Sequence, residues 1–180
     1  SYRTQDVRDA NGCQNSMAED KPSIVFHLAA LTRLSDCEDR PALAHAVNVQ
    51  GTANVFGSMP ATARGLLAST CHVYGRPQVA CIDEAHPTEP HGVYAQSKFS
   101  AEREALASGR DVVTARAFHH TGPGQAPTFV LASWAAQMRA RQSQIAVGDL
   151  DVRRDFCDVR DIVEGYRLLL ERGAPGAVYN

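Results

Sequence analysis

A tyrosine and a lysine four residues apart form the pair with the clearest chemical potential in the sequence. Tyr94 and Lys98 stand in the segment YAQSK, and this spacing places both side chains on one face of a helix, one turn apart. An ammonium group beside a phenol favours the phenolate, so we expect Lys98 to lower the pKa of Tyr94 from its usual value of about 10. The pair could then exchange a proton with a substrate near neutral pH.

The scarcity of lysine strengthens this interpretation. Only two of the 18 lysine and arginine residues are lysines, Lys21 and Lys98. Because the chain uses arginine almost everywhere else, a lysine at position 98 indicates a need for a compact ammonium group with a tunable pKa. The alternative is that Tyr94 and Lys98 have this spacing by chance.

A second source of polar groups is the end of an apolar run at residues 66–71. The run predicts a buried strand whose carboxyl end carries the hydroxyl groups of Ser69 and Thr70. Either hydroxyl could bind a substrate oxygen next to Tyr94. The alternative is that both only satisfy backbone groups at the end of the strand.

Short apolar runs alternate along the chain with longer segments of helical period. This pattern predicts a doubly wound parallel α/β fold of the Rossmann-like type. The predicted strands are residues 23–27, 66–71, 112–118, 145–147 and 177–179. The predicted helices are residues 41–59, 93–107, 129–141 and 158–172. Ligands of such sheets bind beyond the carboxyl ends of the strands, where we expect the loops 76–92 and 119–128.

Composition limits the classes of partner. A chain of 180 residues with 44% hydrophobic content can bury one core. The net charge of −2 is spread along the chain and offers no basic surface for nucleic acid or for a membrane. No apolar run approaches the roughly 18 residues of a membrane span, so we expect a cytoplasmic protein with small-molecule partners. The five cysteines are scattered, without zinc-site spacing, and are interpreted as reduced thiols.

Six motifs occur in the order typical of extended short-chain dehydrogenases/reductases, and the sequence resembles that family from about Asp6 to Asn180. They are VFHLAA from Val25, NVQGT from Asn48, the Ser-Thr run before Val73, Tyr94 with Lys98, RAFHHTGPGQ from Arg116 and RRDF from Arg153. Residues 116–125 and 148–156 are most similar to GDP-4-keto-6-deoxy-mannose reductases, which form GDP-rhamnose. The resemblance implies reduction of the 4-keto group of a GDP-6-deoxyhexose by NADPH or NADH.

The resemblance also implies roles for individual residues. Tyr94 would protonate the oxygen of the C4 ketone, Lys98 would hold the nicotinamide ribose, and Thr70 would donate a hydrogen bond to the keto oxygen. Besides Tyr94 and Lys98, the implied cofactor contacts are Asp6, Val7, Leu28, Ala29, Ala30, Ser69 and Phe118. Besides Thr70, the implied substrate contacts are His119, Gln125 and Arg154, whose forked donors suit a diphosphate.

Two departures from the family pattern bear on the chemistry. Dehydratases carry Asp-Glu after the hydroxyl residue, but this chain has Cys71 and His72 there, which leaves a reductase or, as the alternative, a nucleotide-sugar C4-epimerase. His119 stands where the family usually has Asn. Adjacent strand residues point to opposite faces, so we expect no metal site at His119 and His120.

The sequence lacks a Gly-x-x-Gly-x-x-Gly turn before Asp6, where the family binds the pyrophosphate against backbone N–H groups. We therefore expect residues 1–180 to form a single partial NAD(P)-binding domain, incomplete at both ends, with a substrate-side segment at about 119–157. A complete relative would carry roughly 55 to 65 more residues at its front. The choice between NAD and NADP stays open, as does the alternative of a truncated, non-catalytic chain that binds no dinucleotide.

Two further expectations concern the helices. The resemblance implies a homodimer in the complete protein, paired through helices 41–59 and 93–107. Glu102 and Glu104, which follow Lys98, are interpreted as a solvated helix face.

Overall fold

The computed structural model describes residues 3–76 and 79–180 and divides the chain into two compact units. The first unit comprises Ser1–Ala117 and Tyr166–Asn180, and the second is Phe118–Gly165. The assignment of segment 119–157 to the substrate side stays a prediction.

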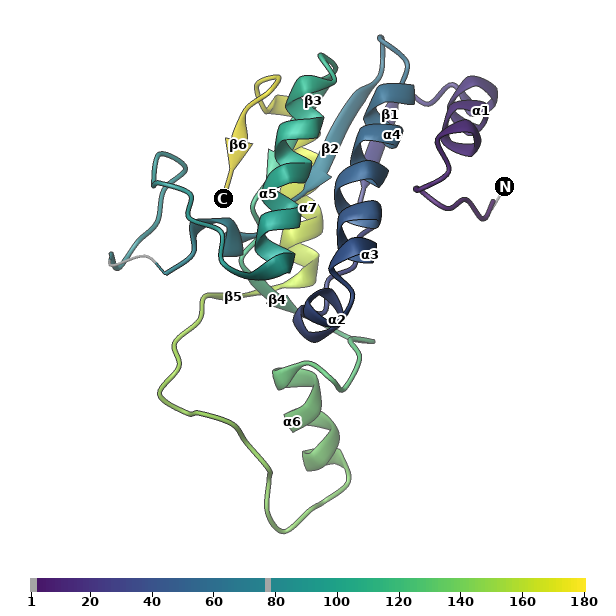
Figure 1. The fold of residues 1–180 in the computed structure, drawn as a ribbon. Helices are drawn as coiled ribbons and strands as arrows, with labels where there is room; N and C mark the ends of the chain where they lie inside the picture. Colours follow the sequence, from purple (N-terminus) through teal and green to yellow (C-terminus); the bar gives the residue numbers. More distant parts are fainter. Residues whose placement is uncertain (1–2, 77–78) are drawn as a thin grey trace. The chain divides into compact units, whose positions relative to one another are not determined.

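A parallel sheet of four strands forms the centre of the first unit (Figure 1). Its order is β1 (Ile24–His27), β2 (Arg64–Ala68), β3 (Asp111–Ala115) and β6 (Val178–Tyr179). All neighbouring strands are parallel, which confirms the predicted α/β class. Ala68 pairs with Ala115, so the residues that follow β2 and β3 leave the sheet at the same edge.

Most helices of the chain belong to the first unit. They are α1 (Ala10–Asp20), α2 (Leu34–Asp39), α3 (Pro41–His45), α4 (Gly51–Ser58) and α5 (Gly92–Ala107), with the 3-10 turn η2 (Cys71–Tyr74) after β2. A π turn, η1 (Ala46–Gln50), joins α3 to α4, so the predicted helix 41–59 is one continuous run with an irregular turn inside it. Helix α7 (Val159–Arg172) begins in the second unit and continues in the first.

Successive residues of β2 serve the two faces of the sheet, as the period of a strand requires. Leu67 packs in a cluster with residues of α1, α4 and α5, among them Phe56. Leu66 packs instead with Val113 of β3 and Leu170 of α7. Helices therefore cover both faces, which explains why the strands read as continuous apolar runs.

The second unit contains a parallel pair of short strands and one helix. They are β4 (His119–Thr121), β5 (Phe156–Asp158) and α6 (Val130–Arg139). Neither short strand was predicted as a separate element.

The predicted strand 145–147 is wrong. This segment is irregular and exposed, and the side chain of Gln137 meets its backbone as a neighbouring strand would. The Gln137 amide accepts from the N–H of Ala146 at 2.7 Å and donates to its carbonyl at 3.1 Å. The backbone groups of Ala146 are thus satisfied by a side chain and not by a neighbouring strand.

Gly51 allows a close approach between α4 and the segment before α1. A Cβ atom at this position would lie 2.6 Å from Cγ2 of Val7, a residue that packs against the larger core cluster. The β-branched side chain of Val7 has little freedom to move aside.

We expect Gly51→Ala to lower the free energy of unfolding by about 1–3 kcal/mol, because the added methyl group overpacks the contact with Val7. Gly57→Ala on the same helix is the matched control, since a Cβ at Gly57 meets nothing within 4 Å. It should be neutral or stabilising through helix propensity. Urea denaturation of both variants checks this, and equal effects would contradict it.

Candidate active site

Helix α5 carries three ionisable side chains at intervals of four residues. Tyr94 is half-buried, Lys98 is 4% exposed and Glu102 is 8% exposed. The interval places them in a row along one face of the helix. At the start of α5, the Glu38 carboxylate of α2 accepts a hydrogen bond from the N–H of Val93 at 2.8 Å. A negative charge at this end of a helix interacts favourably with the helix dipole.

The end of β2 brings hydroxyl groups to this row. Thr70 forms a side-chain hydrogen bond with Tyr94 and accepts from the N–H of His72 at 3.3 Å, which caps η2. The ring of His72 lies against Tyr94, with centroids 5.8 Å apart. Thr70 therefore satisfies a local backbone group and also contacts Tyr94, so the two interpretations of this hydroxyl are compatible.

The predicted direction of the Tyr94 pKa is wrong. Burial raises the pKa of Tyr94, and the hydrogen bond from Thr70 only partly opposes this. Lys98 is not among the groups that shift the pKa of Tyr94. Burial lowers the pKa of Lys98 from 10.5 to about 8, although the negative charge of Glu102 raises it.

A buried histidine lies within reach of the Lys98 charge. His27 Nε2 is 2.9 Å from Thr52 Oγ1, and that hydroxyl donates its proton to the carbonyl of Asn48 at 2.6 Å. The Thr52 oxygen must therefore accept, which assigns the proton of His27 to Nε2. Burial, and then the charge of Lys98, lower the pKa of His27 to about 4, so the ring is neutral at physiological pH.

The side chain of Asn48 fixes the loop after β1 to α5. Its amide accepts from the N–H of Leu31 at 2.7 Å, and donates to the carbonyl of Leu31 at 3.0 Å and to Ser97 Oγ at 2.9 Å. The predicted cofactor contacts Leu28, Ala29 and Ala30 stand in this loop. The sequence marked Asn48 only as part of the NVQGT motif, because the burial that makes its amide a link between the loop and α5 appears only in the folded chain.

Glu102 is a correction to the predicted solvated face. Its carboxylate is bonded to the guanidinium of Arg116, with Nη2 to Oε2 at 2.7 Å and Nε to Oε1 at 3.0 Å. It also accepts a hydrogen bond from Ser69. Glu102 is buried because α5 continues to face the sheet one turn beyond Lys98. Glu104 is half-buried.

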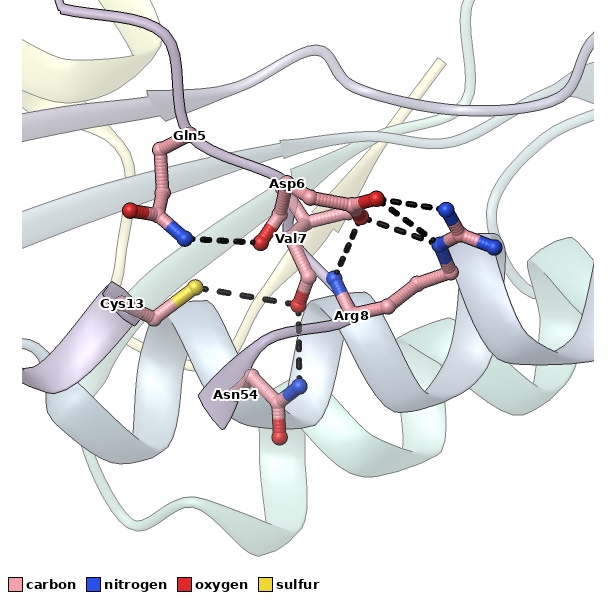
Figure 2. Close-up of polar contacts among 6 residues, drawn as sticks. All are labelled: Gln5, Asp6, Val7, Arg8, Cys13 and Asn54. Carbon is pink, nitrogen blue, oxygen red and sulfur yellow. Dashed lines mark hydrogen bonds and ion pairs between the residues drawn. The ribbon is translucent and has the colours of Figure 1, made fainter. Parts of the chain in front are cut away.

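The predicted cofactor contacts Asp6 and Val7 precede α1 (Figure 2). The Asp6 carboxylate accepts from the backbone N–H of Arg8 at 2.9 Å and from its guanidinium at 2.5 Å, and these hydrogen bonds lower the pKa of Asp6 to about 2. The carbonyl of Val7 accepts from Asn54 at 2.9 Å and from the thiol of Cys13 at 3.7 Å. Val7 is therefore anchored to α4 and α1, while the exposed Asp6 is engaged by its neighbour.

Apart from Thr70, which lies in the first unit, the predicted substrate contacts belong to the second unit. The His119 ring lies 5.6 Å from that of Phe156. Gln125 accepts from Thr121 at 2.6 Å and donates to the carbonyl of His120 at 3.3 Å, so it holds the turn after β4.

Arg154 is exposed and donates to the carbonyl of Arg153 at 2.7 Å, and Phe118 directly precedes β4. The binding roles predicted for these residues stay predictions. Over the described residues, no group of three His, Cys, Asp or Glu side chains is arranged to hold a metal ion. The five cysteines, all within the described residues, form no disulfide.

The profile of the NAD dependent epimerase/dehydratase family matches residues 2–180. The chain belongs to this family. Its relatives include the GDP-6-deoxy-D-mannose reductase of Pseudomonas aeruginosa, 39% identical over 175 residues, which cover 88% of this chain and 57% of the relative. The dTDP-D-glucose 4,6-dehydratase of Homo sapiens is 30% identical over 182 residues, covering 97% of this chain and 52% of the relative.

Solved structures of epimerase/dehydratase family members have the same fold. The structure of RMD from Pseudomonas aeruginosa complexed with NADPH gives a TM-score of 0.90 at 35% identity, covering 99% of this chain and 65% of that one. The chain thus spans little more than half the length of the curated relatives described above. None of the helices in residues 3–76 and 79–180 has the length and apolar character needed to cross a bilayer.

Burial of Lys98 predicts a pH-dependent cost to stability. Because its pKa is lower in the folded protein, the unfolded chain binds more protons between about pH 8 and 10.5, and the free energy of unfolding rises with pH across that window. Lys98→Met should therefore stabilise the protein by about 3 kcal/mol at pH 7, and by progressively less as the pH rises towards 10.

The control is Lys21→Met, because Lys21 is exposed and should show no such dependence. Urea denaturation at pH 7 and pH 10 measures both variants. An equal change for Lys98→Met at the two pH values would contradict the expected burial cost.

Proposed function

We propose that the full-length protein reduces the 4-keto group of a GDP-6-deoxyhexose with NADPH or NADH as hydride donor. The observation that carries the proposal is the hydrogen bond of Thr70 to Tyr94, beside the buried ammonium group of Lys98. The similarity to a GDP-6-deoxy-D-mannose reductase supports the class of substrate.

The donors near Tyr94 fit a dinucleotide. Within the described part of the chain, the Lys98 ammonium group makes no hydrogen bond or ion pair with the protein, and it is not among the buried polar atoms that lack a partner, so it keeps some access to solvent. Its donors are therefore available to a ligand, and two hydroxyl groups of a ribose suit them. Lys98 and the loop held by Asn48 would hold the cofactor, which supplies a hydride when bound. NADPH is the dinucleotide in the similar RMD structure.

Tyr94 is suited to donate a proton. Its raised pKa keeps the phenol protonated at neutral pH, as a general acid requires. The Thr70 oxygen accepts from the N–H of His72, and its hydrogen, which bonds Tyr94 in the protein alone, would turn to a substrate oxygen. As the keto carbon gains a hydride, its oxygen takes the phenolic proton and the product is a secondary alcohol. Lys98 and Thr70 stabilise the phenolate until water returns the proton.

The second unit would bind the nucleotide sugar. We assign the diphosphate to the exposed guanidinium of Arg154, and a sugar contact to His119. Gln125 would act mainly by holding the turn after β4, because both ends of its amide are already hydrogen-bonded. Segment 119–157 would accordingly form the substrate side of the protein.

Tyr94→Phe in the full-length protein should lower kcat by about 10²- to 10⁴-fold, because the variant keeps the ring but cannot donate the proton. KM for the nucleotide sugar should change little. The assay follows NADPH oxidation with GDP-4-keto-6-deoxymannose. Tyr179→Phe is the matched control, since Tyr179 is a half-buried tyrosine of β6 whose hydroxyl accepts from the N–H of Ala174. Near-normal turnover by Tyr94→Phe would rule the mechanism out.

A nucleotide-sugar C4-epimerase is the second candidate within the same family. The two functions differ in cofactor balance, since a reductase consumes one NAD(P)H per sugar and an epimerase regenerates its dinucleotide. Stoichiometric oxidation of NADPH supports the reductase. Interconversion of C4 epimers without net oxidation of the dinucleotide would support the epimerase and contradict the reductase.

We also propose that the full-length protein is a homodimer that pairs through the run from α3 to α4 and through α5. Light scattering should then give twice the mass of one chain. A monomeric mass across the working concentration range would contradict this.

A further inference from the structure

A buried carboxylate beside Lys98 has no part in the proposed reaction. Glu102 lies one turn beyond Lys98 on α5 and is 8% exposed. A buried carboxylate destabilises a fold unless an opposite charge and several hydrogen bonds compensate it. Here every bond to the carboxylate comes from the end of a strand, so the compensation has a geometric consequence.

Two residues supply these bonds. Arg116 donates through Nε to Oε1 at 3.0 Å and through Nη2 to Oε2 at 2.7 Å, a bidentate pairing that fixes orientation as well as distance. Ser69 Oγ donates to Oε1. The remaining arm of Arg116 donates to the hydroxyl of Tyr74 at 3.0 Å. Neither charge is left without a partner.

The bonds connect the catalytic helix to two strands. Ser69 follows β2 and directly precedes Thr70, the residue that contacts Tyr94. Arg116 follows β3, and its N–H donates to the carbonyl of Tyr179 in β6 at 2.7 Å. Displacement of Glu102 would therefore change where Thr70 stands relative to Tyr94.

We propose that Glu102, clamped by Arg116 and Ser69, is a positioning residue for the reduction, because it fixes the end of β2 at the separation from Tyr94 that proton transfer requires. This inference rests on the proposed function. Glu102 itself touches neither substrate nor cofactor in this role.

The charge of Glu102 has a second effect on the site. Burial lowers the pKa of Lys98 and Glu102 raises it, so loss of this carboxylate leaves Lys98 protonated over a narrower pH range. The other charged or titratable groups on the elements packed around α5 are Asp36, Cys37, Glu38 and Asp39 of α2, His45 of α3, Cys71, His72 and Tyr74 of η2, Asp111 of β3, Arg116, and His27 of β1. Among all these groups, Glu102 is the one whose charge shifts the pKa of Lys98.

Glu102→Gln in the full-length protein tests the proposal, because the variant keeps the shape of the side chain and removes its charge. We expect kcat to fall about 10- to 100-fold through misplacement of Thr70, with little change in KM for the nucleotide sugar. The alkaline limb of the kcat profile should move to lower pH. Glu102→Asp keeps the charge, so the alkaline limb of its kcat profile should stay at the wild-type pH. Glu104→Gln, the same change two residues along α5, should behave as wild type.

Glu102→Gln leaves the Arg116 guanidinium buried without its carboxylate, which can prevent folding. The double variant Glu102→Leu/Arg116→Met removes both charges together and tests the same point in a folded protein. A positioning role predicts a folded double variant with lowered kcat and a displaced alkaline limb. A folded double variant with wild-type kcat and limb would overturn the proposal.

A measurement without substrate separates this inference from the proposed function. Protein labelled with [ε-13C]lysine reports the titration of Lys98 by NMR, with the signal assigned by its loss in Lys98→Arg. Titration at lower pH in Glu102→Gln than in wild type supports the role of Glu102 even if the wild-type protein does not reduce the sugar. Identical titration in the two proteins would refute it.

Discussion

A positive charge held away from water is the constraint that the rest of the candidate site satisfies. The side chain of Lys98, on α5, is buried, and burial lowers its pKa. Its surroundings compensate in two ways, because His27 stays neutral and Glu102 supplies a negative charge. Glu102 in turn needs Arg116. These compensations extend from the helix to the ends of the strands, which is why the site requires an assembled sheet and not α5 alone.

The register of the sheet fixes the positions of the groups that compensate these charges. Because Ala68 pairs with Ala115, Ser69 and Arg116 leave the sheet together and can meet one carboxylate. Asn48 makes a second link to α5, because its amide joins the loop after β1 to the helix. Parallel strands that end in line, with a helix across them, thus bring together groups that are far apart in sequence.

The sequence was sufficient where the physics is local. The spacing of Tyr94 and Lys98 follows from the period of one helix, and the parallel sheet follows from the alternation of apolar runs with helical segments. It was insufficient where burial or a distant partner decides. The solvated face predicted at Glu102 ignored Arg116, which only the folded sheet brings near. The pKa of Tyr94 has the opposite direction from the prediction because spacing does not report burial. At residues 145–147, three apolar residues did not define a strand.

The π turn at Ala46–Gln50 bears on how this chain is compared with others. A turn closed by i→i+5 hydrogen bonds contains one residue more than an α turn, yet α3 and α4 continue through it as one rod. Asn48 lies inside this turn, and Thr52 follows it. A relative with a regular α-helix here would be one residue shorter within the helix and would still reach the same two contacts. The gap in an alignment of the two chains would then fall inside a helix, where alignment methods penalise gaps most heavily, and not in a loop.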